Sequence, residues 1–74
     1  MLLNTALDQA EKLLEAAGVP TPKVDSQLLL AHTLNISKGE LQTQLVMDGH
    51  CSEGEFDQFA ALIRERCKRI PLQH

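Results

Sequence analysis

Residues 22–34 read PKVDSQLLLAHTL, and this stretch does most to indicate the fold of the chain. Thr21 before it is a typical helix-capping residue, and Pro22 suits the first helical position because its missing N–H leaves no hydrogen bond unmade. The run Leu28–His32 puts apolar side chains on more than one side of a helix. A helix that is apolar over so wide an arc needs neighbours on several sides, so we expect residues 22–34 to form a helix in the middle of a bundle.

A first helix is expected before this stretch, from about Asn4 to Ala17. Apolar residues recur there at helical spacing, and the charged residues lie off that stripe. Gly18 supplies the left-handed position that commonly ends a helix, and the sequence VPTP that follows it cannot continue one.

Two capping boxes predict where the later helices begin. SKGE (residues 37–40) and SEGE (residues 52–55) each place a serine three residues before a glutamate, so that each side chain can satisfy the backbone amide of the other residue. The helix after the first box could divide into two short pieces, because Gly39 lowers its helix propensity. The helix after the second box is expected to run to about Ile70, where Pro71 ends it.

The sequence therefore predicts an all-α fold, a small bundle of four to five short helices. With 74 residues the chain is one domain with a small core, because a chain near this size buries only about 60% of its unfolded surface. We expect residues 1–70 to form the helical domain and residues 71–74 to begin a linker to a part that follows. The predicted core consists of Leu7, Leu14, Leu28, Leu29, Ala31, Leu34, Leu41, Phe56, Phe59, Ile63 and Cys67.

Composition and charge exclude several classes of function. The chain is 43% hydrophobic and 23% charged, as in ordinary soluble domains, and its net charge of −3 disfavours a general binder of nucleic acid or anionic membranes. No stretch is long and apolar enough to cross a bilayer, and MLLNTALDQ (residues 1–9) lacks the features of a secretory signal. Cys51 and Cys67 form neither a CxxC motif nor a disulfide framework. We therefore expect a cytoplasmic, monomeric protein.

Five side chains are of a type that can bind metal: His32, His50, Cys51, Cys67 and His74. Zinc sites usually contain closely spaced ligand pairs, whereas here only His50 and Cys51 are close in sequence, and neighbours on an extended chain point apart. These two also lack an evident third group that would orient a base beside a thiol. Cys67 lies on an apolar stripe, and His32 is expected to be a partly buried polar tip. Because the glycines are isolated as well, we predict no catalytic, cofactor or metal site.

Residues 28–45, LLLAHTLNISKGELQTQL, have the outline of a helix-turn-helix motif. In such a motif the second helix presents its first residues to bases and phosphates. Here those positions hold Lys38, Gly39, Glu40, Gln42 and Gln44. Only one of these residues is positively charged, so the helix would neutralise little phosphate. A DNA-binding module is therefore an alternative interpretation, and two helices that meet at a short capped turn are the simpler one.

The basic cluster RERCKR (residues 64–69) ends the last predicted helix. Positive side chains complement the partial negative charge at a helix C-terminus, and Glu65 can pair with Arg69 four residues later. Four positive charges within six residues nevertheless exceed what the helix dipole requires. Arg64, Arg66 and Arg69 are therefore our candidates for docking an acidic partner or RNA.

Two stretches resemble one protein family. PKVDSQLLLAHTL resembles the P..DAELLLAHVL signature near the start of the release-factor glutamine methyltransferases of the HemK/PrmC type. FAALIRERCKRIPLQH (residues 59–74) resembles that family's F..L..RR..GEPLQYI.G, and the spacing between the two stretches also fits. The resemblance covers nearly the whole chain, with departures at Ser26-Gln27, at residues 67–70 and at His74.

The resemblance implies that recognition and catalysis are separated in the full-length enzyme. Enzymes of this family transfer a methyl group from S-adenosylmethionine to the glutamine of the GGQ motif in class 1 peptide chain release factors. Their Gly-rich cofactor loop and NPPY motif belong to a C-terminal Rossmann-like domain, and neither motif occurs here. The resemblance implies that residues 1–70 match the helical N-terminal domain that helps to hold the release factor. It also implies that residues 71–74 begin the linker to the absent catalytic domain.

The expected role of this chain is therefore that of a non-catalytic recognition domain for a class 1 release factor. A generic helical adaptor with another partner is a further alternative. The predicted partner contacts are Asp25, Arg64, Arg66, Arg69 and Gln73.

Overall fold

The computed structural model describes residues 1–68. Within that range the chain forms four helices: α1 (Leu3–Ala16), α2 (Pro22–Leu34), α3 (Lys38–Val46) and α4 (Glu53–Lys68). The predicted all-α bundle is confirmed, and the third segment is one continuous helix. The predicted helix end at Ile70 and the predicted linker at residues 71–74 lie outside the described residues. Among the four described helices, none combines the length and hydrophobicity needed to span a bilayer.

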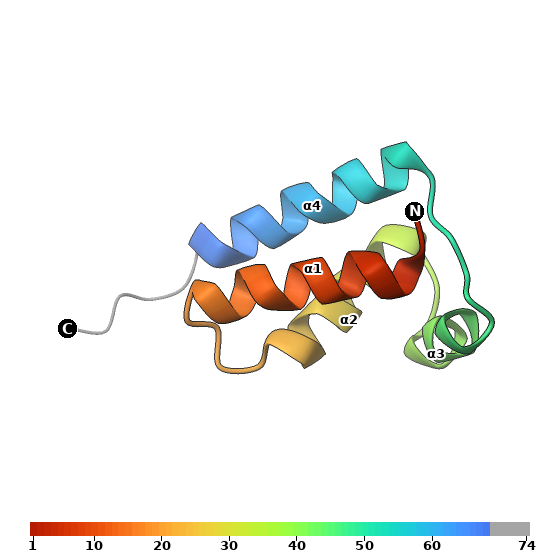
Figure 1. The fold of residues 1–74 in the computed structure, drawn as a ribbon, viewed down its shortest axis with the longest axis horizontal. Coiled ribbons are helices and arrows are strands. Elements are labelled where there is room, and N and C mark those ends of the chain that lie inside the picture. The colour runs from red at the N-terminus through yellow and green to blue at the C-terminus, as the bar shows by residue number, and fades with distance from the viewer. Residues whose placement is uncertain (69–74) are drawn as a thin grey trace.

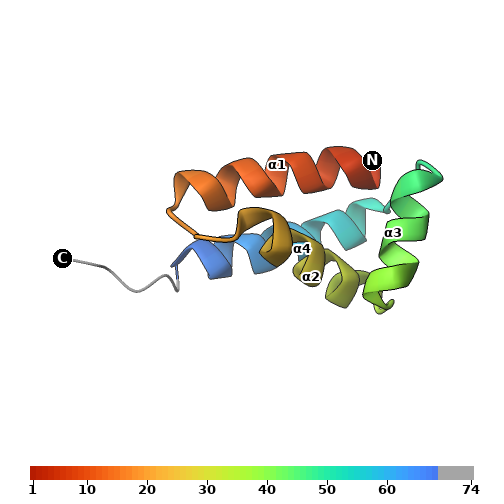
Figure 2. The same cartoon turned by 90° about the horizontal axis from the view of Figure 1, so that it is seen from below.

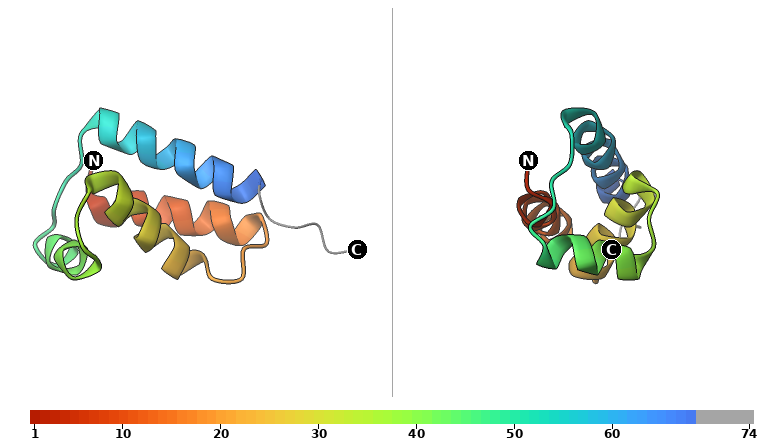
Figure 3. Two further views of the ribbon diagram at one scale, coloured as in Figure 1. Left: turned by 180° about the vertical axis from the view of Figure 1, so that it is seen from behind. Right: turned by 90° about the vertical axis from the view of Figure 1, so that its right-hand side faces the viewer.

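Three helices lie side by side, and α3 crosses one end of them. α1 and α4 run in the same direction, and α2 packs against both in the opposite direction (Figures 1 and 2). α3 crosses the end of the bundle at which α1 begins and α2 finishes (Figure 3). α1 and α2 each contact all three of the other helices. The predicted middle position of α2 is thereby confirmed, and α1 shares it.

Local sequence explains where the helices begin and end. At the start of α3, the Glu40 amide donates to Ser37 Oγ at 3.1 Å, and the Ser37 amide donates to Glu40 Oε1 at 3.3 Å. At the start of α4, the Glu55 amide donates to Ser52 Oγ at 3.1 Å, and the Ser52 amide donates to Glu55 Oε1 at 2.8 Å. Gly18 has a φ of +89°, the left-handed conformation that glycine adopts without strain. Both predicted capping boxes and the predicted glycine stop are confirmed.

The start of α2 differs in one respect from the expectation. The Thr21 hydroxyl, which we predicted to cap the backbone, instead donates to Asp25 Oδ1 at 3.3 Å. The predicted cap is absent because Thr21 has φ −129° and ψ 64°, outside the extended conformation from which an N-cap side chain accepts the amides of the first turn. Pro22 does occupy the first helical position.

The core is formed by the inward faces of all four helices. Its large side chains that are at most 1% exposed are Leu3, Leu14, Leu30, Leu41, Phe59 and Ile63. The members of the predicted core that are buried are Leu7, Leu14, Ala31, Leu41, Phe59 and Ile63. Those that are partly buried and pack against it are Leu29, Leu34, Phe56 and Cys67.

Leu28 is the exception, because its side chain is 50% exposed and its predicted place in the core is wrong. Leu28 and Leu30 are about 200° apart around a helix, so they cannot face the same neighbour. α2 turns Leu30, Ala31 and Ser26 inward instead. The buried Ser26 hydroxyl donates to the Lys23 carbonyl at 3.0 Å, so its burial does not leave the hydroxyl unpaired.

The first residues of the chain pair with the segment between α3 and α4. The Leu3 amide donates to the Gly49 carbonyl at 2.8 Å, and the Cys51 amide donates to the Met1 carbonyl at 2.9 Å. The two segments form an isolated antiparallel bridge. This pairing ties the beginning of α1 to the loop that leads into α4.

Candidate functional site

Two of the predicted partner contacts lie against each other. Asp25 is in the first turn of α2 and Arg66 is in the last turn of α4, 41 residues away in the sequence. Arg66 Nε lies 3.0 Å from Asp25 Oδ2, as a hydrogen bond within an ion pair. The other carboxylate oxygen, Asp25 Oδ1, accepts the Thr21 hydroxyl. Both oxygens of Asp25 therefore have a partner inside the chain.

This ion pair is partly shielded from water. The side chains of Asp25 and Arg66 are 17% and 35% exposed. Residues 1–68 contain a second ion pair, Asp8–Lys12 within α1, whose side chains are 67% and 76% exposed. Exposed pairs contribute little to stability, whereas shielding from water strengthens the attraction between opposite charges. The Asp25–Arg66 pair is thus the one expected to hold two helices together.

The other basic side chains of α4 point elsewhere. Arg64 is exposed, and two residues along a helix place it about 200° around the axis from Arg66. Lys68, which was not among the predicted contacts, is exposed one turn after Arg64. These two residues form what we call the Arg64–Lys68 face. Like charges four residues apart repel each other slightly, so the helix gains no stability from this pairing.

The three predicted contacts within residues 1–68 therefore do not form one patch. The structure brings Asp25 and Arg66 together and separates Arg64 from them. Arg69 and Gln73 lie outside the described residues. The spacing of four residues between Arg64 and Lys68 is the signal that would have identified the Arg64–Lys68 face in the sequence.

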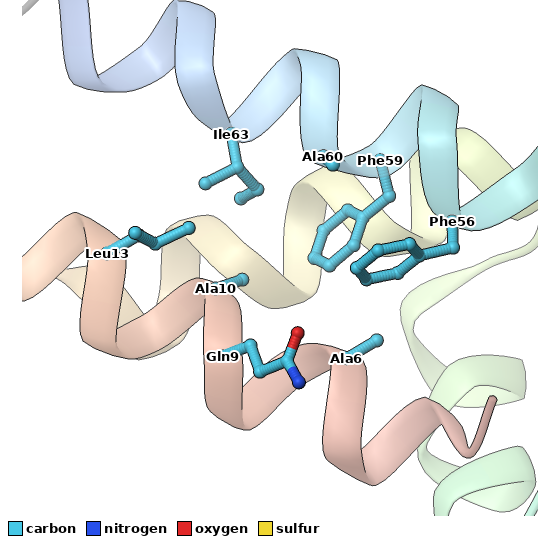
Figure 4. Close-up of a pocket in the computed structure, with 8 residues that line it drawn as sticks. All are labelled: Ala6, Gln9, Ala10, Leu13, Phe56, Phe59, Ala60 and Ile63. Carbon is cyan, nitrogen blue, oxygen red and sulfur yellow. The ribbon is translucent and has the colours of Figure 1, made fainter.

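A narrow hollow lies between α1 and α4. Its walls are formed by Ala6, Gln9, Ala10, Leu13, Phe56, Phe59, Ala60 and Ile63 (Figure 4). The rings of Phe56 and Phe59 lie side by side and point toward α1. The volume of about 30 Å³ is close to the share of one water molecule, and small-molecule sites are roughly ten times larger or more. Gln9 is the polar residue of these walls, so the hollow offers neither an acid nor a base for catalysis.

The residue types that can bind metal are dispersed. Within residues 1–68, no group of three or more His, Cys, Asp or Glu side chains is placed to hold a metal ion. Cys51 is buried and Cys67 is partly buried. His32 is exposed, so its predicted partial burial is wrong, because the inward side of this turn is occupied by the adjacent Ala31. His74 lies outside the described residues.

The helix-turn-helix alternative would be formed by α2 and α3. Two side chains at the start of α3 are engaged with the chain itself. Glu40 accepts the Ser37 amide, and Gln42 Nε2 donates to Gln27 Oε1 of α2 at 3.1 Å. Lys38 carries the single positive charge of α3. Since phosphate neutralisation supplies most of the affinity for DNA, this geometry adds no support to DNA binding.

Comparison with known proteins identifies the family. The family model described as the PrmC N-terminal domain matches residues 5–74, which is nearly the whole chain. The chain belongs to this family. The family predicted from PKVDSQLLLAHTL and FAALIRERCKRIPLQH is thereby confirmed.

Relatives of this PrmC N-terminal domain are named release factor glutamine methyltransferase. The protein of Mycolicibacterium smegmatis is 43% identical over 72 residues, which cover 97% of this chain and 24% of the relative. The protein of Corynebacterium glutamicum is 40% identical over 74 residues, which cover 100% of this chain and 24% of the relative. The protein of Deinococcus radiodurans is 38% identical over 76 residues, which cover 100% of this chain and 26% of the relative.

The chain thus spans about a quarter of the length of the curated relatives it matches. A search of the solved structures found no significant match.

Proposed function

We propose that this PrmC N-terminal domain is the release-factor-recognition part of a protein-glutamine methyltransferase that uses S-adenosylmethionine. The observation that carries the proposal is the match of nearly the whole chain to relatives named release factor glutamine methyltransferase, of which it spans about a quarter. The substrate of the full-length enzyme is the glutamine of the GGQ motif in a class 1 peptide chain release factor. The reaction takes place in the cytoplasm, where release factors act.

Methyl transfer belongs to the remainder of the full-length enzyme. S-adenosylmethionine supplies the methyl group there, and the hollow between α1 and α4 is too small to hold it. The hollow between α1 and α4 has a volume of about 30 Å³, and a nucleoside with a sulfonium group needs a far larger and more polar site. The chain also lacks a Gly-rich cofactor loop and an NPPY motif. Methylation of a release factor by residues 1–74 alone would contradict this assignment.

A separate recognition domain can still accelerate the reaction. Holding a large protein substrate so that one amide nitrogen reaches the methyl donor replaces a random encounter by an oriented one, which lowers the activation free energy. The helical bundle is suited to this role because a shared core holds its four helices together while other side chains of each helix are exposed.

The Arg64–Lys68 face is the surface of α4 that we assign to the release factor. It places two exposed positive charges one turn apart on a chain with a net charge of −3. Such a local positive region attracts an acidic patch on a partner and orients it during the encounter. Arg69 and Gln73 remain predicted contacts, whereas Asp25 and Arg66 are occupied with each other.

Charge reversal in the full-length enzyme tests this assignment. The test variant carries Arg64→Glu with Lys68→Glu. The matched control carries Lys12→Glu with Lys38→Glu, which changes the net charge by the same amount at exposed positions of α1 and α3. We expect the KM for release factor to rise about tenfold in the test variant only, with the Kd for S-adenosylmethionine unchanged in both. An unchanged KM in the test variant, or an equal rise in the control, would refute the assignment of the Arg64–Lys68 face to the release factor.

Two binding assays separate the proposal from its alternatives. Immobilised full-length enzyme should retain a class 1 release factor in preference to other proteins of a lysate, whereas a generic adaptor would retain a different protein. A mobility shift of duplex DNA that weakens with salt would instead support the helix-turn-helix alternative.

A further inference from the structure

The last turn of α4 is held on two sides. Arg66 bonds to Asp25 at the start of α2, and the Cys67 thiol lies 3.8 Å from the Leu13 carbonyl of α1, within the range of a weak S–H···O contact. These contacts lie at the end of the bundle where α1 finishes and α2 begins (Figures 1 and 2). α4 is therefore fastened to both neighbouring helices close to its last described residue, Lys68.

The contact made by Arg66 differs in kind from the packing around it. Apolar contacts are non-directional, so they tolerate a small rotation or tilt of a helix. A hydrogen bond from a planar guanidinium to a carboxylate has a narrow geometry, and here the Thr21 hydroxyl holds the second carboxylate oxygen. A shift of α4 that the core would accept would therefore break the bond between Arg66 and Asp25.

We propose that the Asp25–Arg66 pair is a positioning element, which sets the direction in which the polypeptide leaves α4 toward the catalytic domain. This inference rests on the proposed function, because a domain described as N-terminal precedes the remainder of relatives about four times its length. With the pair intact, a release factor bound to the helical domain meets the active site in one orientation. Without it, the last turn of α4 can shift, and the advantage of a fixed orientation is reduced.

This role differs from two simpler ones. If Asp25 and Arg66 each contacted the release factor separately, the losses in kcat/KM caused by replacing them would add in the double variant. If the pair only stabilised the bundle, its loss would lower the melting temperature without distinguishing one substrate from another. Positioning instead makes the two residues act as one unit, on substrates that contact both domains.

A double-mutant cycle in the full-length enzyme tests the proposal. The variants are Asp25→Asn, Arg66→Gln and the two together, with Asp8→Asn, Lys12→Gln and their combination as the matched control at the exposed pair of α1. The substrates are an intact class 1 release factor and a short peptide with the GGQ glutamine, which is too small to contact both domains. All assays are run at a temperature at which circular dichroism shows every variant to be folded.

We expect each single variant to lose about tenfold in kcat/KM for the intact release factor, and the double variant to lose no more than either one. The kcat/KM for the peptide should change by less than about twofold, and the control cycle should leave both substrates near wild type. Additive losses would assign the two side chains to separate contacts and overturn the proposal. Equal losses on both substrates, or wild-type values throughout the cycle, would overturn it as well.

The wild-type enzyme separates this failure from a failure of the proposed function. If it methylates the peptide and the intact release factor with the same kcat/KM, the helical domain contributes no recognition and the proposed function fails. If it strongly prefers the intact release factor, and the Asp25 and Arg66 variants all have wild-type kcat/KM, the positioning role is refuted and the proposed function stands.

Discussion

Replacing Phe59 by alanine is expected to remove a large part of the stability of the domain. Phe59 is 1% exposed, and its ring points from α4 toward α1 beside Phe56 (Figure 4). Alanine would leave a cavity at the contact between these helices. α2 also packs against both of them, so they cannot close on the cavity without disturbing the rest of the core.

The magnitude follows from the burial and from the size of the chain. Truncation of a buried phenylalanine to alanine typically costs about 3–5 kcal/mol. A domain of 74 residues is expected to have a total free energy of unfolding of roughly 4–11 kcal/mol. Phe59→Ala could therefore unfold the domain outright. Phe59→Leu, which keeps most of the volume and the apolar character, should cost about 1–2 kcal/mol and leave a measurable transition.

Urea unfolding followed by far-ultraviolet circular dichroism measures this cost, because the chain has no Trp or Tyr to report by fluorescence. With a slope of about 1 kcal/mol per molar urea, Phe59→Leu should lower the midpoint by about 1–2 M. The control is Val46→Ala, since Val46 is 84% exposed and its truncation should change the free energy by less than about 0.5 kcal/mol. Equal midpoints for the two variants would refute the assignment of Phe59 to the core.

Three further experiments test local features of the fold. Ser52→Ala should lower the free energy of unfolding by about 1 kcal/mol because its hydroxyl caps α4, and an unchanged urea midpoint would contradict the capping box. Gly49→Ala should destabilise the domain by about 1–3 kcal/mol, since a Cβ there would lie 3.0 Å from the Gln44 carbonyl oxygen. A wild-type melting temperature would contradict this close contact. Leu30→Gln should cost about 3 kcal/mol or more in urea unfolding and Leu28→Gln should be nearly neutral, because only the first buries an amide. A reversed order would refute the assigned inward face of α2.

The helix boundaries could be predicted because their signals are local. A serine three residues before a glutamate satisfies two backbone amides whatever the rest of the chain does, so Ser37 and Ser52 mark the starts of α3 and α4. Gly18 likewise ends α1 through its own backbone conformation. Such signals depend on residues within one turn, which the sequence displays directly.

The inward face of α2 could not be predicted with the same accuracy. The run Leu28–His32 is apolar around much of the helix, so its periodicity does not choose between Leu28 and Leu30. The choice depends on the angle at which α2 meets α1 and α4, and the observed angle leaves Leu28 and His32 at the surface. A buried serine was not anticipated either, and Ser26 is accommodated because its own helix supplies the acceptor.

The ion pair of the candidate site lay beyond the reach of sequence patterns. Ten acidic and seven basic side chains allow many possible ion pairs, and the sequence alone does not choose among them. Asp25 and Arg66 are 41 residues apart. Helix packing makes the selection, because it brings the first turn of α2 beside the last turn of α4. The sequence identified both residues as special and assigned them outward contacts, whereas the structure pairs them with each other.

The contact between α1 and α4 also bears on how the domain is made. α1 begins at Leu3 and α4 begins at Glu53, so the ribosome adds about fifty residues between the two starts. At a synthesis rate of about 5–20 residues per second this takes roughly 3 to 10 seconds. During that interval the apolar stripe of α1 lacks the helix that supplies Phe59 and Ile63, and it stays available to chaperones. The nascent domain can complete its core only when its last helix has emerged.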